Sequence, residues 1–239
     1  MDLSTAYYLP VAFLIAYLVG AIPWAYLIVL GVTGEDITTH GTGNVGAMNV
    51  RRSTGSWVWF SVAMVADALK GLVPTYVAKL VVMSSGALLA LQPWGIYLSQ
   101  QEAAWWRDPL LTVPMAAVAG AVVGHNYSVW MALVHRRFGR TGKGLATGGG
   151  ALLAYDWRYF VAAVVVGLAV IAITRYMMAG QVAASITLPV TAIVLDSPDW
   201  PFALVMGGFV YAAHHHRFIG MLRGHEPKLY INDRMGPTG

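Results

Sequence analysis

Between Asp2 and Glu35 the chain runs for 32 residues without one Asp, Glu, Lys or Arg. A run of about 20 apolar residues lets a helix cross the hydrocarbon core of a bilayer, and the apolar part of a signal peptide is shorter than this. Over all 239 residues 57% are hydrophobic and only 11% are charged, against roughly a quarter in soluble domains. This composition argues against a water-soluble globule and against a disordered chain. It indicates an all-α, polytopic membrane protein that forms one domain over residues 1–239.

Short polar segments divide the rest of the chain, so we expect seven transmembrane helices. Their expected ranges are 7–31, 57–82, 110–133, 144–155, 158–174, 176–195 and 200–218. Apolar periodicity cannot decide whether the short segment 144–155 is a half-helix, a re-entrant segment or a tilted span. An internal repeat of the kind that marks the inverted halves of transporters is not visible.

The distribution of Lys and Arg selects the orientation of these helices. With seven spans and the N-terminus outside, 11 of the 15 basic residues fall in cytoplasmic segments. These are Arg51, Arg52, Arg136, Arg137, Arg140, Lys143, Arg175, Arg217, Arg223, Lys228 and Arg234. The outer segments contain the acids Asp2, Glu102, Asp108, Asp156, Asp196 and Asp199, with Arg107, Arg158 and Lys79. The sequence therefore predicts an outer N-terminus and a cytoplasmic C-terminus.

The chain has no cysteine, which excludes disulfides, thiolate zinc sites and thiol-based catalysis. No basic amphipathic face is present, so a nucleic-acid partner is not expected. The consecutive His214, His215 and His216 lie about 100° apart around a helix and cannot share one face. Since no carboxylate stands at helical spacing from them, we expect neither a metal site nor another cofactor.

The first cytoplasmic loop reads GTGNVGAMNVRR over residues 41–52. Closely spaced glycines let backbone N–H groups converge on an anion, and Thr, Asn and Arg add donors for phosphate. The pattern lacks the Gly-Lys-Ser/Thr of a nucleotide P-loop. It fits a phosphate cradle, and it fits equally well a flexible turn with a membrane anchor at Arg51 and Arg52.

The second cytoplasmic loop reads RRFGRTGKGLATGGG over residues 136–150. Lys143 stands between two glycines where a helix is expected to begin, and free N–H groups at a helix start favour an anion. For Arg136, Arg137 and Arg140 the favoured interpretation is a topology signal or contact with anionic lipid headgroups.

Two polar features lie inside expected spans. Asp67 and Lys70 have the spacing of an ion pair on one helical face, and we favour a structural role for this pair. His125 stands alone near the cytoplasmic half of the third span, where a hydrogen-bonded packing role is the more common outcome.

Six segments in this order resemble the signature of one family. They are GTGNVGAMN at 41–49, DALKG at 67–71, GH at 124–125, GKGLAT at 142–147, TRY at 174–176 and GHE at 224–226. The family is the bacterial integral-membrane acyl-phosphate:glycerol-3-phosphate acyltransferase of the Y type. The resemblance covers almost the whole chain and implies seven spans in the bacterial inner membrane, with the active site on the cytoplasmic face. It implies acyl transfer from acyl phosphate to the 1-hydroxyl of glycerol 3-phosphate, which gives 1-acylglycerol 3-phosphate (lysophosphatidate) and phosphate in the first step of phospholipid synthesis.

The same resemblance assigns the site residues. The implied catalytic residues are Thr42, Arg52, Lys143 and His214. The implied substrate- and phosphate-binding residues are Gly43, Asn44, Gly46, Asn49, Gly144, Thr147 and Arg217. Arg52 and Lys143 would clamp phosphate, the Gly43–Gly46 backbone would receive the departing phosphate, and Thr42 would align the acceptor hydroxyl. Since phosphate leaves readily as an anion, positioning and charge neutralisation suffice, and we expect no covalent acyl-enzyme.

The chain departs from the family pattern at several positions. Thr42 replaces a serine, Thr141 a glycine and Arg217 an asparagine, and residues 92–108 form a longer outer loop. Arg217 could add a phosphate contact, or it could mark an enzyme for another phosphorylated acceptor. A membrane transporter of phosphate or an organic anion is the alternative from another class, but the anion-binding residues gather on one side of the bilayer. The expected partners are acyl phosphate, glycerol 3-phosphate and membrane lipids, for a chain acting as a monomer.

Overall fold

The computed structural model describes residues 7–84 and 108–225, and within these ranges every regular element is a helix. The elements are α2 (Tyr8–Gly20), α3 (Trp24–Thr33), the 3₁₀ turn η1 (Ile37–Thr39), α4 (Ala47–Thr54), α5 (Trp57–Ser84), α6 (Pro109–Asn126), α7 (Val129–His135), α8 (Leu145–Tyr155), α9 (Trp157–Thr174), α10 (Met177–Val194) and α11 (Trp200–Leu222). The predicted all-α class is confirmed for this part of the chain. The predicted outer loop 92–108 lies almost wholly outside it.

Within the described residues, five helical segments are long and apolar enough to cross a membrane: Tyr8–Thr33, Trp57–Met83, Leu110–His135, Trp157–Thr174 and Met177–Val194. The fold is therefore that of an integral membrane protein. Helix α11 has 23 residues, whereas α8 has 11. At 1.5 Å per residue α8 is about 17 Å long, against about 30 Å of hydrocarbon, so it has the length of a half-helix.

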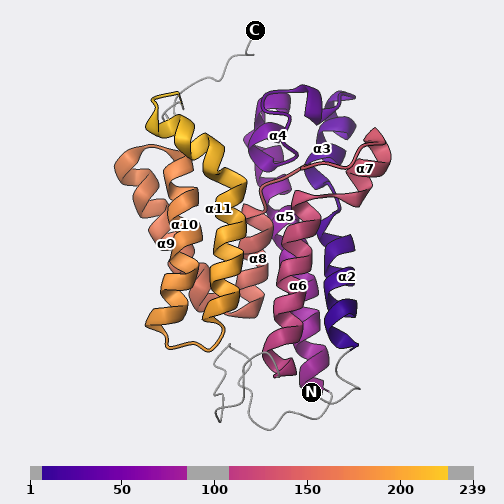
Figure 1. Ribbon diagram of the computed structural model, residues 1–239. Helices are drawn as coiled ribbons and strands as arrows, with labels where there is room; N and C mark the ends of the chain where they lie inside the picture. The colour runs from indigo at the N-terminus through magenta and orange to yellow at the C-terminus, as the bar shows by residue number, and fades with distance from the viewer. Residues whose placement is uncertain (1–6, 85–107, 226–239) are drawn as a thin grey trace.

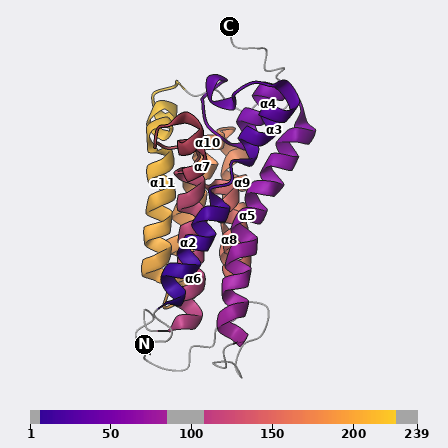
Figure 2. The same ribbon diagram turned by 90° about the vertical axis from the view of Figure 1, so that its right-hand side faces the viewer.

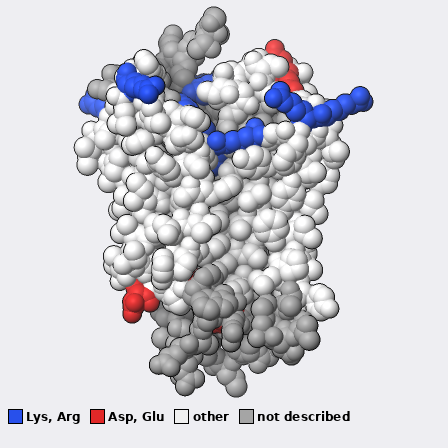
Figure 3. Space-filling view, in the orientation of Figure 1, with Lys and Arg blue, Asp and Glu red and all other residues white. Residues whose placement is uncertain are grey.

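The helices run in alternating directions between two ends of one bundle (Figure 1). The segment between α3 and α5, the loop between α7 and α8, and the end of α11 all lie in the upper half of the bundle in this view. The turns at Asp156 and at residues 195–199 lie at the lower end. On the face seen in Figure 3, Lys and Arg side chains gather at the upper end, above a broad band without charged residues.

Two helices that the sequence predicts as continuous are each broken. The predicted helix 7–31 is interrupted between α2 and α3, where Pro23 has no N–H to donate. The predicted helix 110–133 is interrupted at Tyr127, and the Ser128 hydroxyl caps α7 by accepting from the N–H of Met131. The same hydroxyl donates a 2.5 Å hydrogen bond to the carbonyl of Ala21. A residue at the break after α6 thus supplies a hydrogen-bond donor for a backbone carbonyl at the break after α2. Figure 2 shows α2 lying against α6, and the two breaks follow the ends of these helices.

Helices α5 and α8 approach each other at glycines. A Cβ on Gly71 would overlap the carbonyl oxygen of Thr147, and one on Gly150 would overlap that of Ala68. Any larger side chain would push the two backbones apart. This close contact fixes the start of α8, which carries the second glycine-rich loop, against α5.

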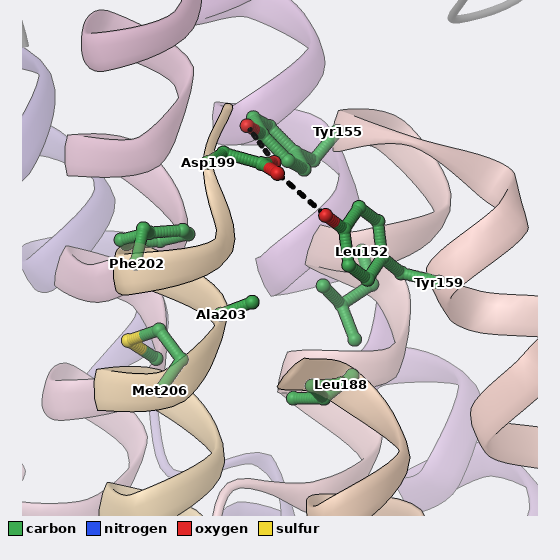
Figure 4. A pocket seen from close by; sticks show the side chains of 8 residues that line it. All are labelled: Leu152, Tyr155, Tyr159, Leu188, Asp199, Phe202, Ala203 and Met206. Carbon is green, nitrogen blue, oxygen red and sulfur yellow. Dashed lines mark hydrogen bonds between the residues drawn. The ribbon is translucent and has the colours of Figure 1, made fainter. Parts of the chain in front are cut away.

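The lower end of the bundle is closed by a buried cluster of two tyrosines and one carboxylate (Figure 4). The hydroxyls of Tyr155 and Tyr159 each donate a 2.6 Å hydrogen bond to Asp199, which is 2% exposed. Beside this cluster, apolar side chains including Leu188 and Met206 enclose a cavity of about 10 Å³. That volume holds about one water molecule, so the cavity is no substrate site.

Candidate functional site

The predicted site residues lie in four segments in the upper half of the bundle as seen in Figure 1. These are residues 41–52, residues 142–144, the first turn of α8 and the last part of α11. The first segment starts from a well-anchored turn. Asp36 caps η1 by accepting from both the N–H (2.8 Å) and the hydroxyl (2.7 Å) of Thr38, and it pairs with His135 at 2.7 Å. Partial burial opposes ionisation, but hydrogen bonds from Thr38 and His135 hold the pKa of Asp36 below its usual value.

Asn49 anchors the same segment from within. Its amide donates two hydrogen bonds of 3.0 Å, to the carbonyls of Ile37 and His40, and the residue is 2% exposed. Both amide hydrogens are therefore used inside the protein, and only an acceptor oxygen remains. A phosphate oxygen needs a donor, so these two bonds leave no amide hydrogen for the predicted contact of Asn49 with phosphate, which stays a prediction. Asn49 shapes the loop.

The backbone of residues 43–46 also differs from the expected cradle. The N–H of Gly43 donates to His40, that of Gly46 donates to Asn44, and that of Val45 donates to the carbonyl of Thr141 at 2.8 Å. Three of the four N–H groups are thus engaged within the protein. In this structure those three N–H groups are not open to an anion, since each is already bonded to a carbonyl. That this backbone receives the departing phosphate stays a prediction.

Thr42 and Arg52 lie on this loop and the following helix. Thr42 is exposed, and within residues 7–84 and 108–225 its hydroxyl makes no hydrogen bond. The stem of Arg52 passes over the loop, because a Cβ on Gly41 would lie 3.1 Å from its Cδ. Asn44 and Gly46 are neighbours, with the Asn44 amide 2.8 Å from a Cβ position on Gly46.

Thr141 is the residue that joins the two loops. Its carbonyl accepts from Val45, its N–H donates to the carbonyl of Asn126 at 2.7 Å, and its hydroxyl donates to the carbonyl of His125 at 2.9 Å. In the sequence, Thr141 stands out only as a residue that replaces a glycine of the family pattern. The structure makes it the point where loop one, loop two and the end of α6 meet.

Lys143 and Gly144 lead directly into α8. Gly144 occupies the N-cap position in the left-handed region at φ 75°, and no side chain caps the helix. The first N–H groups of α8 therefore have no intrahelical partner and no side-chain cap. Thr147, in the same first turn, is fully buried, and its hydroxyl oxygen has no hydrogen-bond partner within the described part of the chain. A helix start of this kind beside a lysine favours an anion.

His214 is the histidine of the three that turns into the protein. It is 1% exposed, whereas His216 is exposed. Its Nδ1 donates to the carbonyl of Val210 at 2.7 Å, because a carbonyl can only accept. Among the described residues Nε2 has no hydrogen-bond partner, and Lys143 and Arg217 lie close enough to interact with the ring electrostatically. Lys143, Arg140 and Arg217 thus surround the His214 ring with positive charge within electrostatic range.

Arg140 performs a role that sequence reasoning missed. Its guanidinium donates to the carbonyl of Gly142 at 3.1 Å and to the carbonyl of Ala213, so it ties the second loop to α11. In the sequence, the positive charge of Arg140 is equally compatible with a contact to lipid headgroups and with these hydrogen bonds to the backbone. The last predicted motif is only partly described: the N–H of His225 donates to Gly220, and Glu226 lies outside the described residues.

A family comparison decides which proteins this arrangement belongs with. The model of the glycerol-3-phosphate acyltransferase family matches residues 10–224. The chain belongs to this family. The resemblance predicted from the motifs is thereby confirmed.

Individual family members match over nearly their full length. The glycerol-3-phosphate acyltransferase of Thermosynechococcus vestitus is 33% identical over 230 residues, which cover 95% of this chain and 98% of that protein. The enzyme of that name from Thermus thermophilus is 33% identical over 220 residues, covering 90% and 92%. A crystal structure of PlsY (YgiH), an integral membrane glycerol 3-phosphate acyltransferase in its glycerol 3-phosphate form, superposes with a TM-score of 0.72. At 24% identity it covers 93% of this chain and 96% of PlsY, and the two proteins share one fold.

Proposed function

We propose that the protein transfers an acyl chain from an acyl phosphate to the 1-hydroxyl of glycerol 3-phosphate, giving lysophosphatidate and inorganic phosphate. Membership of the glycerol-3-phosphate acyltransferase family supports the acceptor and the reaction class. The observation that carries the proposal is the positive charge of Lys143 and Arg217 near the buried His214 ring, next to the start of α8. Within the described residues Nε2 of this ring has no hydrogen-bond partner and no side chain caps α8. This arrangement offers positive charge for phosphate and an acceptor for a hydroxyl proton.

The chemistry requires one new bond and one broken bond. The glycerol oxygen forms a bond to the acyl carbonyl carbon, and the bond from that carbon to the phosphate oxygen breaks. Phosphate departs with the electron pair, and the hydroxyl proton leaves with it. The His214 Nε2 lone pair accepts the hydrogen bond of the attacking hydroxyl and orients it, since Nδ1 is already committed to Val210.

Charge neutralisation falls to the cations. Lys143 and the first N–H groups of α8 bind the departing phosphate, because three N–H groups of residues 43–46 are already used. Arg52 and Arg217 bind the phosphate of the acceptor, and Thr42 aligns its hydroxyl. The reaction uses no metal, no cofactor and no covalent acyl-enzyme.

We place the upper end of Figure 1 at the cytoplasmic face of the bacterial inner membrane. The excess of Lys and Arg at this end supports that orientation. With α2–α3 and α6–α7 counted as one span each, and the short α8 counted as a span of its own, the chain passes the membrane seven times, and it acts as a monomer. A one-sided anion site of this kind argues against a transporter, whose site lies near the midplane.

The test supplies purified protein with palmitoyl phosphate and glycerol 3-phosphate and follows phosphate release and lysophosphatidate. We expect both products in equal amounts, and no product when palmitoyl-CoA replaces palmitoyl phosphate. A folded protein that forms no lysophosphatidate with palmitoyl phosphate, or that uses palmitoyl-CoA equally well, contradicts the proposal.

A further inference from the structure

The proposed chemistry leaves one buried ion pair without a role. Lys70 and Asp67 on α5 are 5% and 2% exposed, and their charged groups lie 2.9 Å apart. The Lys70 ammonium also donates a 2.8 Å hydrogen bond to the carbonyl of Ile22, at the break between α2 and α3. Apolar residues would stabilise a bundle at least as well as a buried pair. The pair therefore calls for a further explanation.

His125 of α6 stands between this pair and the second loop. One edge of its ring faces α5, with Nδ1 3.8 Å from the carboxylate of Asp67. The opposite edge faces Gly142, where an added Cβ would overlap Nε2 and Cδ2 and would lie 2.7 Å from the carbonyl oxygen of His125. The ring thus separates the charged pair from the backbone one residue before Lys143.

Hydrogen bonds from Thr141 also hold the second loop against the end of α6. The hydroxyl of Thr141 donates to the carbonyl of His125, and the N–H of Thr141 donates to the carbonyl of Asn126. A Cβ on Gly144 would lie 3.1 Å from the Asn126 side-chain oxygen. The loop around Lys143 therefore packs against residues 125 and 126, and the His125 ring is the side chain that lies against Gly142.

We propose that His125 is a positioning residue for Lys143. The Asp67 carboxylate, paired with Lys70, lies behind the ring at 3.8 Å from Nδ1, which makes no hydrogen bond within the described residues. The ring fixes how far the Gly142 backbone stands from α5. This inference rests on the proposed function, in which Lys143 binds phosphate. A displacement of about 1 Å in a phosphate-binding group can cost on the order of a hundredfold in rate.

A compensation experiment tests this relationship with the variants Gly142→Ala, His125→Ala and the double variant. We measure kcat and KM for both substrates, with the melting temperature as a check of folding. Gly142→Ala and His125→Ala each lower kcat/KM by about tenfold or more, from opposite sides of one contact. In the double variant the new methyl group occupies space left by the ring, so its loss is smaller than the product of the two single losses. Gly139→Ala is the matched control, because within the described residues no atom other than those of its chain neighbours lies within 4 Å of a Cβ there.

A second double-mutant cycle, between His125 and Lys143, distinguishes positioning of Lys143 by His125 from a general effect of His125 on the fold. In a Lys143→Ala background, His125→Ala should change kcat/KM by less than about twofold, because its effect acts through Lys143. Where His125→Ala does not fold, His125→Gln replaces it, and the comparison of Gly142→Ala with Gly139→Ala needs no change at His125.

The outcomes distinguish the two proposals. An active wild type that is impaired by Lys143→Ala supports the proposed function. If in that protein Gly142→Ala behaves like Gly139→Ala, or His125→Ala keeps its full effect without Lys143, the positioning role alone is overturned. A wild type that makes no lysophosphatidate, or full activity in Lys143→Ala, overturns both.

Discussion

The backbone N–H of Val45 donates a 2.8 Å hydrogen bond to the carbonyl oxygen of Thr141, and this bond joins the two glycine-rich loops. Val45 is 5% exposed, so water does not replace the bond easily. Val45→Pro removes the donor and should lower kcat/KM by about tenfold or more, because the two halves of the site are no longer held in register. Val45→Ala keeps the N–H and should retain most of the activity. Equal activity of the two variants, measured at matched folded fraction, would show that the bond does not organise the site.

The charges assigned to phosphate should be indispensable. Lys143→Ala and Arg52→Ala should each lower turnover by about a hundredfold, the usual cost of removing a group that neutralises transition-state charge. The circular dichroism spectrum should not change, since both side chains lie at the edge of the bundle. Arg137→Ala is the control, because Arg137 is an exposed arginine at the same end. Near wild-type turnover in either variant would remove that residue from the site.

The three consecutive histidines should differ sharply in their effects. His214→Ala removes the buried Nε2 and should lower kcat by about a hundredfold, the range for a group that orients or accepts a proton. His216→Ala changes an exposed ring and should leave kcat within about twofold of wild type. Steady-state kinetics at saturating substrate compare the two. A larger effect at His216 than at His214 would contradict the assignment.

The lower cluster should matter for stability and not for catalysis. Tyr159→Phe removes one of the two 2.6 Å hydrogen bonds to the buried Asp199. Hydrogen bonds to charged groups contribute about 1.5–3 kcal/mol, so the free energy of unfolding should fall by about that amount. The KM for glycerol 3-phosphate should stay unchanged, since the cluster lies at the end of the bundle away from the site (Figures 1 and 4). A changed KM with unchanged stability would argue that the cluster communicates with the site.

The sequence predicts those parts of the fold that depend on local composition. Long apolar runs predict the helices, and the glycine-rich loops with Lys143 point to one end of the bundle. The breaks at Pro23 and Ser128 are harder to predict, because each depends on contacts with the other helix, such as the bond from Ser128 to Ala21. An uninterrupted run of apolar residues predicts one continuous helix even where the backbone leaves the helical conformation.

The site shows the same limit at the level of single bonds. A glycine-rich pattern indicates that N–H groups are accessible, but not whether a carbonyl such as that of Thr141 already accepts from one of them. Asn49 and Arg140 likewise have donor groups suited to phosphate or lipid, and tertiary contacts engage those donors elsewhere. Burial distinguishes His214 from His215 and His216 in the structure. Three identical consecutive residues do not show in the sequence which of them is buried.

The most direct test of the account is a structure of the protein with glycerol 3-phosphate bound. We predict the phosphate in the upper half of the bundle, with an oxygen within about 3.2 Å of the Arg52 or Arg217 side chain, and the 1-hydroxyl directed to Nε2 of His214. A phosphate bound at the lower end, or one that touches neither cation, would contradict the site.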